Sequence, residues 1–178
     1  MAFTVDHSQT NELKPVGKYE VIVNKVVERY TKNNTPYLNF TFTIRNDVSN
    51  PVKGGKLFGA LYKKKQPTAA DLAVDGYSMA QVQAWCKAAK FANGRSFENL
   101  AEVCEALTGA LVIVQLKHEE YNGKTYERVD SLPEPTNHPD CKHQSKQTAV
   151  QQNTLPQGLS PDANGFAELA DDDSDVPF

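Results

Sequence analysis

The sequence predicts a mainly β fold, in which five strands form a barrel and helices lie between the third and fourth strands. Three observations predict this class. Apolar and polar residues alternate along residues 36–46. A run rich in Val, Ile and Tyr covers residues 17–30, and the apolar spacing becomes helical near residue 78. The predicted folded domain therefore begins and ends with strands and has helices between them.

The first three predicted strands precede residue 66. Residues 17–30 are rich in Val, Ile and Tyr, which favour a strand, and we expect a bulge near Asn24. Residues 31–35 have the composition of a turn, so the strand over 36–46 closes a hairpin. After a loop, residues 56–65 form the third predicted strand.

Two helices are predicted next. Residues 78–90 begin with Ser78 and have Gln81 three positions later, which is the pattern of a capping box. A second helix is predicted from Ser96 to Gly109, because apolar residues recur at helical spacing and glycine commonly ends a helix.

The last two predicted strands flank an Asn-Gly turn. They cover residues 110–120 and 125–132, and the Asn-Gly pair is a strong signal for a tight hairpin. Five strands with helices between the third and fourth match the five-stranded Greek-key barrel called the OB-fold. A plain five-stranded α+β sheet with a helical layer has the same element order.

Composition divides the chain into four parts. Residues 1–13 are predicted to be a flexible arm and residues 14–133 the folded domain. Residues 134–170 are rich in Pro, Gln, Ser and Asn and lack periodicity, so we predict a disordered linker. Residues 171–178, DDDSDVPF, form an acidic tip that cannot bury itself and is predicted to bind a partner. Its predicted partner-binding residues are Asp171, Asp172, Asp173, Asp175, Val176, Pro177 and Phe178.

The charge is distributed unevenly along the chain. The whole chain carries −3, yet residues 14–65 hold eleven Lys and Arg against three acids. Residues 136–178 hold two Lys against seven acids. Clustered positive charge attracts polyanions, and a tethered negative end competes for the same surface. We therefore hypothesise that the tip competes with nucleic acid for the basic region.

The composition is that of a soluble protein, with 39% hydrophobic and 23% charged residues. No apolar run approaches the ~18 residues of a membrane span, and no secretory signal is visible. The three cysteines, Cys86, Cys104 and Cys141, lack paired spacing and are predicted to be thiols in a reducing compartment. We expect a cytoplasmic protein with no membrane partner.

The sequence contains no catalytic motif, so we predict that the protein is not an enzyme and takes no cofactor. His138, Cys141 and His143 lie close together but offer three ligands, whereas structural zinc takes four. No metal site is predicted.

Aromatic and basic side chains gather on the outward faces of the second and third predicted strands and on two hairpin loops. With Leu57 and Leu61 facing inward, Phe58 and Tyr62 face outward among lysines. Such rings stack on unpaired bases, while cations neutralise phosphates. The predicted DNA-binding residues are Lys18, Arg29, Tyr30, Lys32, Tyr37, Asn39, Thr41, Arg45, Lys56, Phe58, Tyr62, Lys63, Lys64, Lys65, Tyr121, Lys124 and Tyr126. A slip of strand phase by one residue would instead place Phe58 and Tyr62 in the core.

The tip closely resembles the acidic C-terminal tip of bacterial single-stranded DNA-binding proteins, with Val176 where Ile is more usual. Residues 14–132, through GKYEVIVNKVVERYTKNNTPYLNFTFTI and KHEEYNGKTYERVDSL, are similar to the phage-encoded single-stranded DNA-binding family. The resemblance implies an OB-fold, a role in phage replication or recombination, and recruitment of replication and recombination enzymes by the tip. It also implies that the protein acts in the cytoplasm of a bacterial host.

The expected function is sequence-independent binding and protection of single-stranded DNA. One alternative is a single-strand annealing or RNA-binding protein on the same fold. Another is a protein-interaction adaptor whose acidic tail mimics DNA. No interface stripe stands out, so the sequence leaves open whether the chain forms a homo-oligomer.

Overall fold

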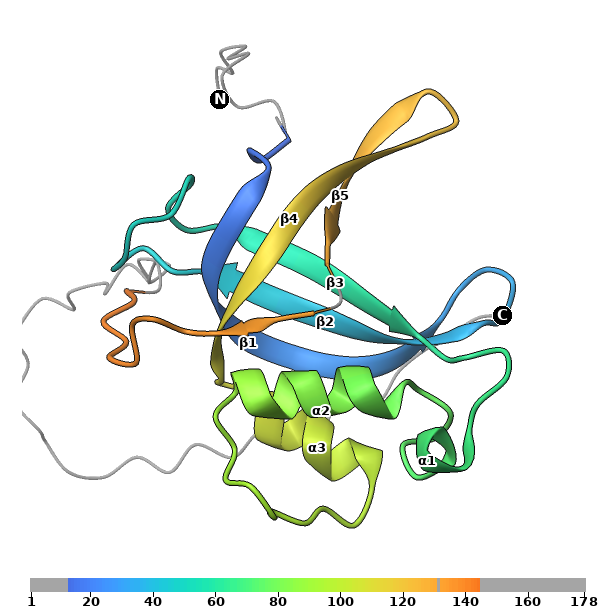
Figure 1. Cartoon of the computed structure of the whole chain (residues 1–178). Coiled ribbons are helices and arrows are strands. Elements are labelled where there is room, and N and C mark those ends of the chain that lie inside the picture. The colour runs from blue at the N-terminus through green and yellow to red at the C-terminus, as the bar shows by residue number, and fades with distance from the viewer. Residues whose placement is uncertain (1–12, 131, 145–178) are drawn as a thin grey trace, which may run out of the picture. The chain divides into compact units, whose positions relative to one another are not determined.

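Six strands form one antiparallel sheet in the computed structural model, which describes residues 13–130 and 132–144 (Figure 1). The order across the sheet is β3-β2-β1-β4-β5, and β6 pairs with β4. The strands are β1 (Gly17–Tyr30), β2 (Pro36–Ile44), β3 (Lys56–Tyr62), β4 (Leu111–Tyr121), β5 (Lys124–Val129) and β6 (Glu134–Pro135). The mainly β class is confirmed.

The five strands of the predicted barrel are present, but the sheet that they form does not close. β3 and β5 form its two edges; they approach each other but do not pair, so the sheet is open. The sixth strand was not predicted, because it is two residues long and contains a proline. These two open edges border the candidate site.

A bulge bends β1, as predicted. The register of β1 against β2 shifts between Val23 and Lys25, which leaves Asn24 unpaired. The start of β1 (17–20) pairs with β4 alone, Val21 and Ile22 pair with both neighbours, and the rest of the strand pairs with β2 alone. The long β1 can therefore curve across the sheet (Figure 1).

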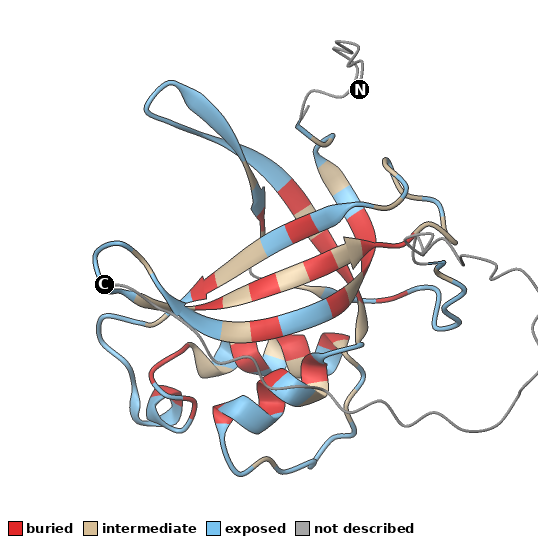
Figure 2. Ribbon diagram, turned by 180° about the vertical axis from the view of Figure 1, so that it is seen from behind, coloured by how far each residue is buried: buried red, intermediate tan, exposed pale blue. Residues whose placement is uncertain are grey.

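The helices α2 (Met79–Ala88) and α3 (Leu100–Leu107) cover one face of the sheet, and α1 (Ala69–Leu72) lies beside them (Figure 1). Trp85 of α2 stacks on Phe40 with ring centroids 4.3 Å apart. The alternation in β2 is confirmed, because its inward residues are buried and the residues between them are half-buried (Figure 2). Within the described residues, no helix is long and apolar enough to cross a membrane.

The start of α2 differs from the prediction. Ser78 occupies the N-cap position but its side chain makes no capping hydrogen bond. Instead, the Met79 N–H donates to Asp71 Oδ1 at 2.9 Å. A capping box forms one helix earlier, between Thr68 and Asp71, in the four-residue α1 that was not predicted. The Asp71 carboxylate therefore joins the starts of two helices.

The second predicted helix begins later than expected. α3 starts at Leu100, not near Ser96, because Asn99 is its N-cap and accepts from the Glu102 N–H at 3.0 Å. Gly109 follows the helix with φ 86°, in agreement with the predicted stop.

The segment after β5 corrects the predicted linker boundary. Residues 134–144 pack on the domain, although the composition suggested a linker from 134. The Arg45 guanidinium donates to the His138 and Asp140 carbonyls, both at 2.6 Å. The Asp47 carboxylate accepts from the Lys142 N–H at 2.7 Å. The rest of the predicted linker, most of the predicted arm and the acidic tip lie outside the described residues.

Candidate nucleic-acid interface

A groove of about 420 Å³ lies between β3 and the β4–β5 hairpin, at the open edges of the sheet. Four exposed aromatic side chains line it: Phe58 and Tyr62 come from β3, and Tyr121 and Tyr126 come from the hairpin. The hairpin is exposed along most of its length and stands clear of the helices (Figures 1 and 2). Rings predicted from separate parts of the sequence therefore meet in one groove.

The predicted phase of β3 is confirmed. Phe58 and Tyr62 are 59% and 45% exposed, while Leu57 and Leu61 are buried. Gly59 faces the core, where a Cβ atom would lie only 3.1 Å from Cε2 of Phe42. The Phe42 ring fills the space that a side chain at position 59 would need, so packing fixes which residues face outward.

The outward face of β2 continues the aromatic surface. Tyr37 lies opposite Tyr62 in the β2–β3 pairing, and their ring centroids are 5.4 Å apart. Asn39 also lines the groove, and Thr41 lies opposite Phe58. The predicted outward residues from Tyr37 to Thr41 therefore border the rings of β3.

The prediction that Arg45 belongs to the interface is wrong. Its side chain is fully buried and forms an ion pair with Asp47 at 2.7 Å, in addition to its bonds to the segment 134–144. The strict alternation ends at Ile44, and the chain turns after it. Arg45 therefore holds the fold together and cannot contact a nucleic acid.

The remaining predicted cations fall into two groups. Three are already paired: Lys18 with Glu134, Lys63 with Glu28 and Lys64 with Asp71. The others are exposed and form no ion pair with any residue that the structure describes. They are Arg29, Lys32, Lys56, Lys65 and Lys124. This second group could meet phosphates without first losing a carboxylate partner.

Two acids also line the groove. Glu119 pairs with Arg128 at 2.7 Å, and Glu127 pairs with Lys14 at 3.1 Å. These ion pairs offset the local negative charge. The sequence analysis did not predict Arg128. It lies two positions after Tyr126 in β5 and therefore on the same face of the strand.

The hairpin turn positions two of the predicted residues. Asn122 and Gly123 have φ values of 50° and 71°, which two-residue hairpin turns of this type require. Tyr121 and Lys124 pair across the turn. A ring and a cation therefore lie side by side at the hairpin end.

Glu28 connects the β1–β2 hairpin to the helical layer. Its carboxylate accepts from Tyr77 at 2.8 Å and from Tyr30 at 3.4 Å, and it pairs with Lys63 at 2.9 Å. The hydrogen bonds from Lys63 and then Tyr77 lower the pKa of Glu28, while burial and then the Glu28 contact raise the pKa of Tyr77. Because Glu28 lies opposite the buried Leu38 in the β1–β2 pairing, Glu28 and Tyr30 lie on the helical side of the sheet. The structure therefore does not bring Tyr30 together with the other predicted rings on the outward face.

No cluster of three or more His, Cys, Asp or Glu able to hold a metal occurs among the described residues. In the segment that contains His138 and Cys141, the His143 ring accepts from the Asn46 N–H at 3.2 Å. That histidine anchors the segment to the domain.

The chain belongs to a family described as "Protein of unknown function (DUF669)", whose model matches residues 3–141. No curated protein matches the chain. The family description assigns no activity.

Proposed function

We propose that the chain binds single-stranded DNA without sequence preference, in the groove between β3 and the β4–β5 hairpin. One observation carries the proposal: four exposed aromatic side chains from two distant parts of the chain line the same groove. Large apolar rings are costly to expose to water, and a group of them usually marks a binding surface.

The chemistry of the groove suits a polynucleotide. Aromatic stacking contributes about 1–3 kcal/mol per base and tolerates any sequence, because every base has a flat face. The exposed cations Arg29, Lys32, Lys56, Lys65 and Lys124, which pair with no acid in the part of the chain that the structure describes, supply charge for the phosphates. A duplex hides the faces of its bases, so the rings favour an unpaired strand.

We also propose that the sheet is an OB-fold variant that is open between β3 and β5. Three features support this: β1 pairs with both β2 and β4, a bulge bends β1, and the helices lie between β3 and β4 in the chain. In this proposal the DNA-binding groove follows the opening between the two edge strands.

The biological role that we propose follows the resemblance. The protein would protect single strands during phage replication or recombination in the host cytoplasm, without catalysing a reaction. Its acidic tip would recruit partner enzymes, because Phe178 offers an aromatic ring beside a run of aspartates.

The test is a titration of the full chain into end-labelled oligo-dT, measured by fluorescence anisotropy. Matched RNA and duplex DNA serve as competitors. We expect oligo-dT to bind and duplex to compete poorly. Preferred binding of RNA would assign the groove to the RNA-binding alternative, and absence of any oligonucleotide binding would favour the adaptor. Loss of the strand in the presence of magnesium would contradict a purely binding role.

A further inference from the structure

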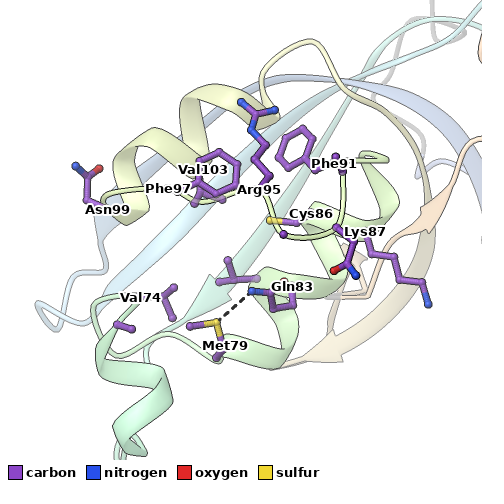
Figure 3. Close-up of a pocket in the computed structure, with 15 residues that line it drawn as sticks. Val74, Met79, Gln83, Cys86, Lys87, Phe91, Arg95, Phe97, Asn99 and Val103 are labelled. Atoms are coloured by element: carbon purple, nitrogen blue, oxygen red, sulfur yellow. Dashed lines mark hydrogen bonds between the residues drawn. The ribbon is translucent and has the colours of Figure 1, made fainter.

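A second cavity, of about 620 Å³, lies between α2, the loop that follows it and the start of α3 (Figure 3). Three buried aliphatic side chains, Val74, Val82 and Val103, form its floor. The half-buried rings of Phe91 and Phe97 form part of its wall. An apolar floor within a polar rim is typical of a protein–protein contact that takes one anchoring side chain.

The exposed rim of this cavity is positively charged. Its cations are Lys87 and Arg95, its other polar side chains are the amides of Gln83, Asn93 and Asn99, and no lining residue that the structure describes is an acid. Neither cation forms an ion pair with a residue in 13–130 or 132–144. Both can therefore pair with an added carboxylate without first losing one.

Arg95 lies between the two rings of the wall. Its guanidinium carbon is 4.7 Å from the centre of the Phe91 ring and 4.8 Å from that of Phe97 (Figure 3). The rings hold the guanidinium in place, while its hydrogen-bond donors point along its edges and remain available to an anion. A carboxylate can accept two parallel hydrogen bonds from such a group.

Backbone hydrogen bonds fix the loop that carries these side chains. The Phe91 N–H donates to the Cys86 carbonyl at 3.1 Å, and the Arg95 N–H donates to the Ala92 carbonyl at 3.1 Å. Gly94, with φ 85°, allows the turn between them. Because the loop is already ordered, less conformational entropy is lost when a ligand binds.

We propose that this cavity is a docking site for a partner protein, and that it takes an acidic segment in which an aromatic or large aliphatic side chain lies beside Asp or Glu. The apolar side chain fills the cavity above the floor, and the neighbouring carboxylate pairs with Arg95. Charge complementarity carries the choice of partner. An acid-free rim with two cations attracts carboxylates and repels basic segments.

A nucleic acid is also an anion, but it fits this cavity less well. Unpaired bases bind proteins by stacking on open ring faces, and the Arg95 guanidinium already lies over the rings of Phe91 and Phe97. The floor is aliphatic and offers no further ring. The cavity lies on the helical side of the sheet, whereas the aromatic groove lies on the other side, so a docked partner would leave the groove open.

The first experiment selects peptides from a random library displayed on phage, against the full chain and, in parallel, against R95Q. We expect the parent chain to enrich peptides in which an aromatic or large aliphatic residue lies next to Asp or Glu, and R95Q not to enrich them. Absence of enrichment, or a consensus that is basic or uncharged, would overturn the proposal.

Matched variants then test the guanidinium with one enriched peptide, by fluorescence anisotropy. R95Q should weaken binding about ten-fold or more, because charge-assisted hydrogen bonds are lost. R29Q removes another exposed arginine, which is absent from the cavity lining, and should leave binding unchanged. Replacing the acids of the peptide by amides should weaken binding to the parent chain but have little further effect on R95Q. Equal effects of R95Q and R29Q, or additive effects of R95Q and the amide peptide, would contradict a direct contact.

Nuclear magnetic resonance of the nitrogen-15-labelled full chain locates the peptide. Its addition should shift the signals of Cys86, Phe91 and Arg95 and leave those of Phe58 and Tyr126 in place. Shifts confined to Phe58 and Tyr126, or displacement of the peptide from the cavity by oligo-dT, would overturn the proposal, the second by assigning the cavity to nucleic acid. The peptide measurements without oligo-dT do not depend on DNA binding, so failure of the proposed function would leave their outcome unchanged.

Discussion

The rings of Tyr37 and Tyr62 lie 5.4 Å apart across the β2–β3 pairing, with their planes inclined by 31°. The pairing of two strands holds both rings, so their positions are set by backbone hydrogen bonds. A base that stacks on Tyr62 would meet a ring that its neighbour already restrains. Less rotamer freedom is then lost on binding than for an isolated side chain.

Phe58→Ala and Tyr62→Ala should each weaken oligo-dT binding, by about 1–3 kcal/mol if each ring stacks on one base. Because both side chains are exposed, the free energy of unfolding should change little. Anisotropy titration measures the first quantity, and urea denaturation measures the second.

Leu72→Ala is the control for these two variants, because Leu72 is an apolar residue of α1 that is 64% exposed and lies outside the groove lining. It should leave binding unchanged. A loss of 3 kcal/mol or more in unfolding free energy for Phe58→Ala would mean that the ring packs in the core.

Adjacent lysines should differ in their effect on salt dependence. Lys65 has no ion-pair partner among the described residues, whereas Lys64 pairs with Asp71 at 2.8 Å. If Lys65 contacts a phosphate, Lys65→Gln should make the slope of log K against log salt shallower by about 0.7. Lys64→Gln should change the slope less and lower the melting temperature. The reverse pattern would place the phosphate contact at Lys64.

Arg45→Gln should destabilise the domain by about 3–5 kcal/mol, because it removes a buried cation, leaves the half-buried Asp47 carboxylate unpaired with it and frees two carbonyls of the segment 134–144. Urea denaturation measures the loss. Protease cleavage within 134–144 should also become faster than in the parent chain. A loss below 1 kcal/mol would show that the segment is held by other contacts.

Gly59→Ala should cost about 1–3 kcal/mol of stability, because the added Cβ would lie 3.1 Å from Cε2 of Phe42 in a packed core. Ala60→Ser, on the opposite face of the same strand, is the control and should change stability by less than about 0.5 kcal/mol. Equal effects would indicate that β3 can shift to admit the methyl group.

Stability should fall in acid. The hydrogen bond from Arg45 lowers the pKa of Asp47 below its ordinary value of 3.8, and the hydrogen bonds from Lys64 and then the Met79 N–H lower that of Asp71. In both cases the unfolded chain takes up protons first, so this stabilisation is complete well above pH 4 and is lost as the pH falls below it. Urea midpoints between pH 7 and pH 2.5 measure the effect.

Asp71→Asn is the variant that isolates one carboxylate. It should have a lower midpoint at neutral pH and a smaller decrease on acidification than the parent chain. An unchanged pH profile would show that Asp71 does not contribute to the acid sensitivity.

Local patterns in the sequence predicted much of the sheet. The alternation of β2, the bulge in β1 and the Asn-Gly turn all depend on residues near one another in the chain, so they could be predicted. The exposure of Phe58 and Tyr62 followed from the same alternation, with Gly59 marking the inward phase.

Long-range contacts decided the features that were missed. Arg45 continues the outward series of β2, yet the segment 134–144 covers it, and composition gave no sign of that packing. The capping of α2 by Asp71 depends on a carboxylate eight residues away that Lys64 also holds. Whether β3 pairs with β5 depends on the curvature of the whole sheet, which no single strand encodes.

The distribution of aromatic residues also has a spectroscopic consequence. The chain has one tryptophan, Trp85, which is buried against Phe40 on the helical side of the sheet. The tyrosines of the groove lie on the other face. Tryptophan emission should therefore report unfolding and stay silent when a ligand occupies the groove, whereas quenching of tyrosine emission should report occupancy in the same sample.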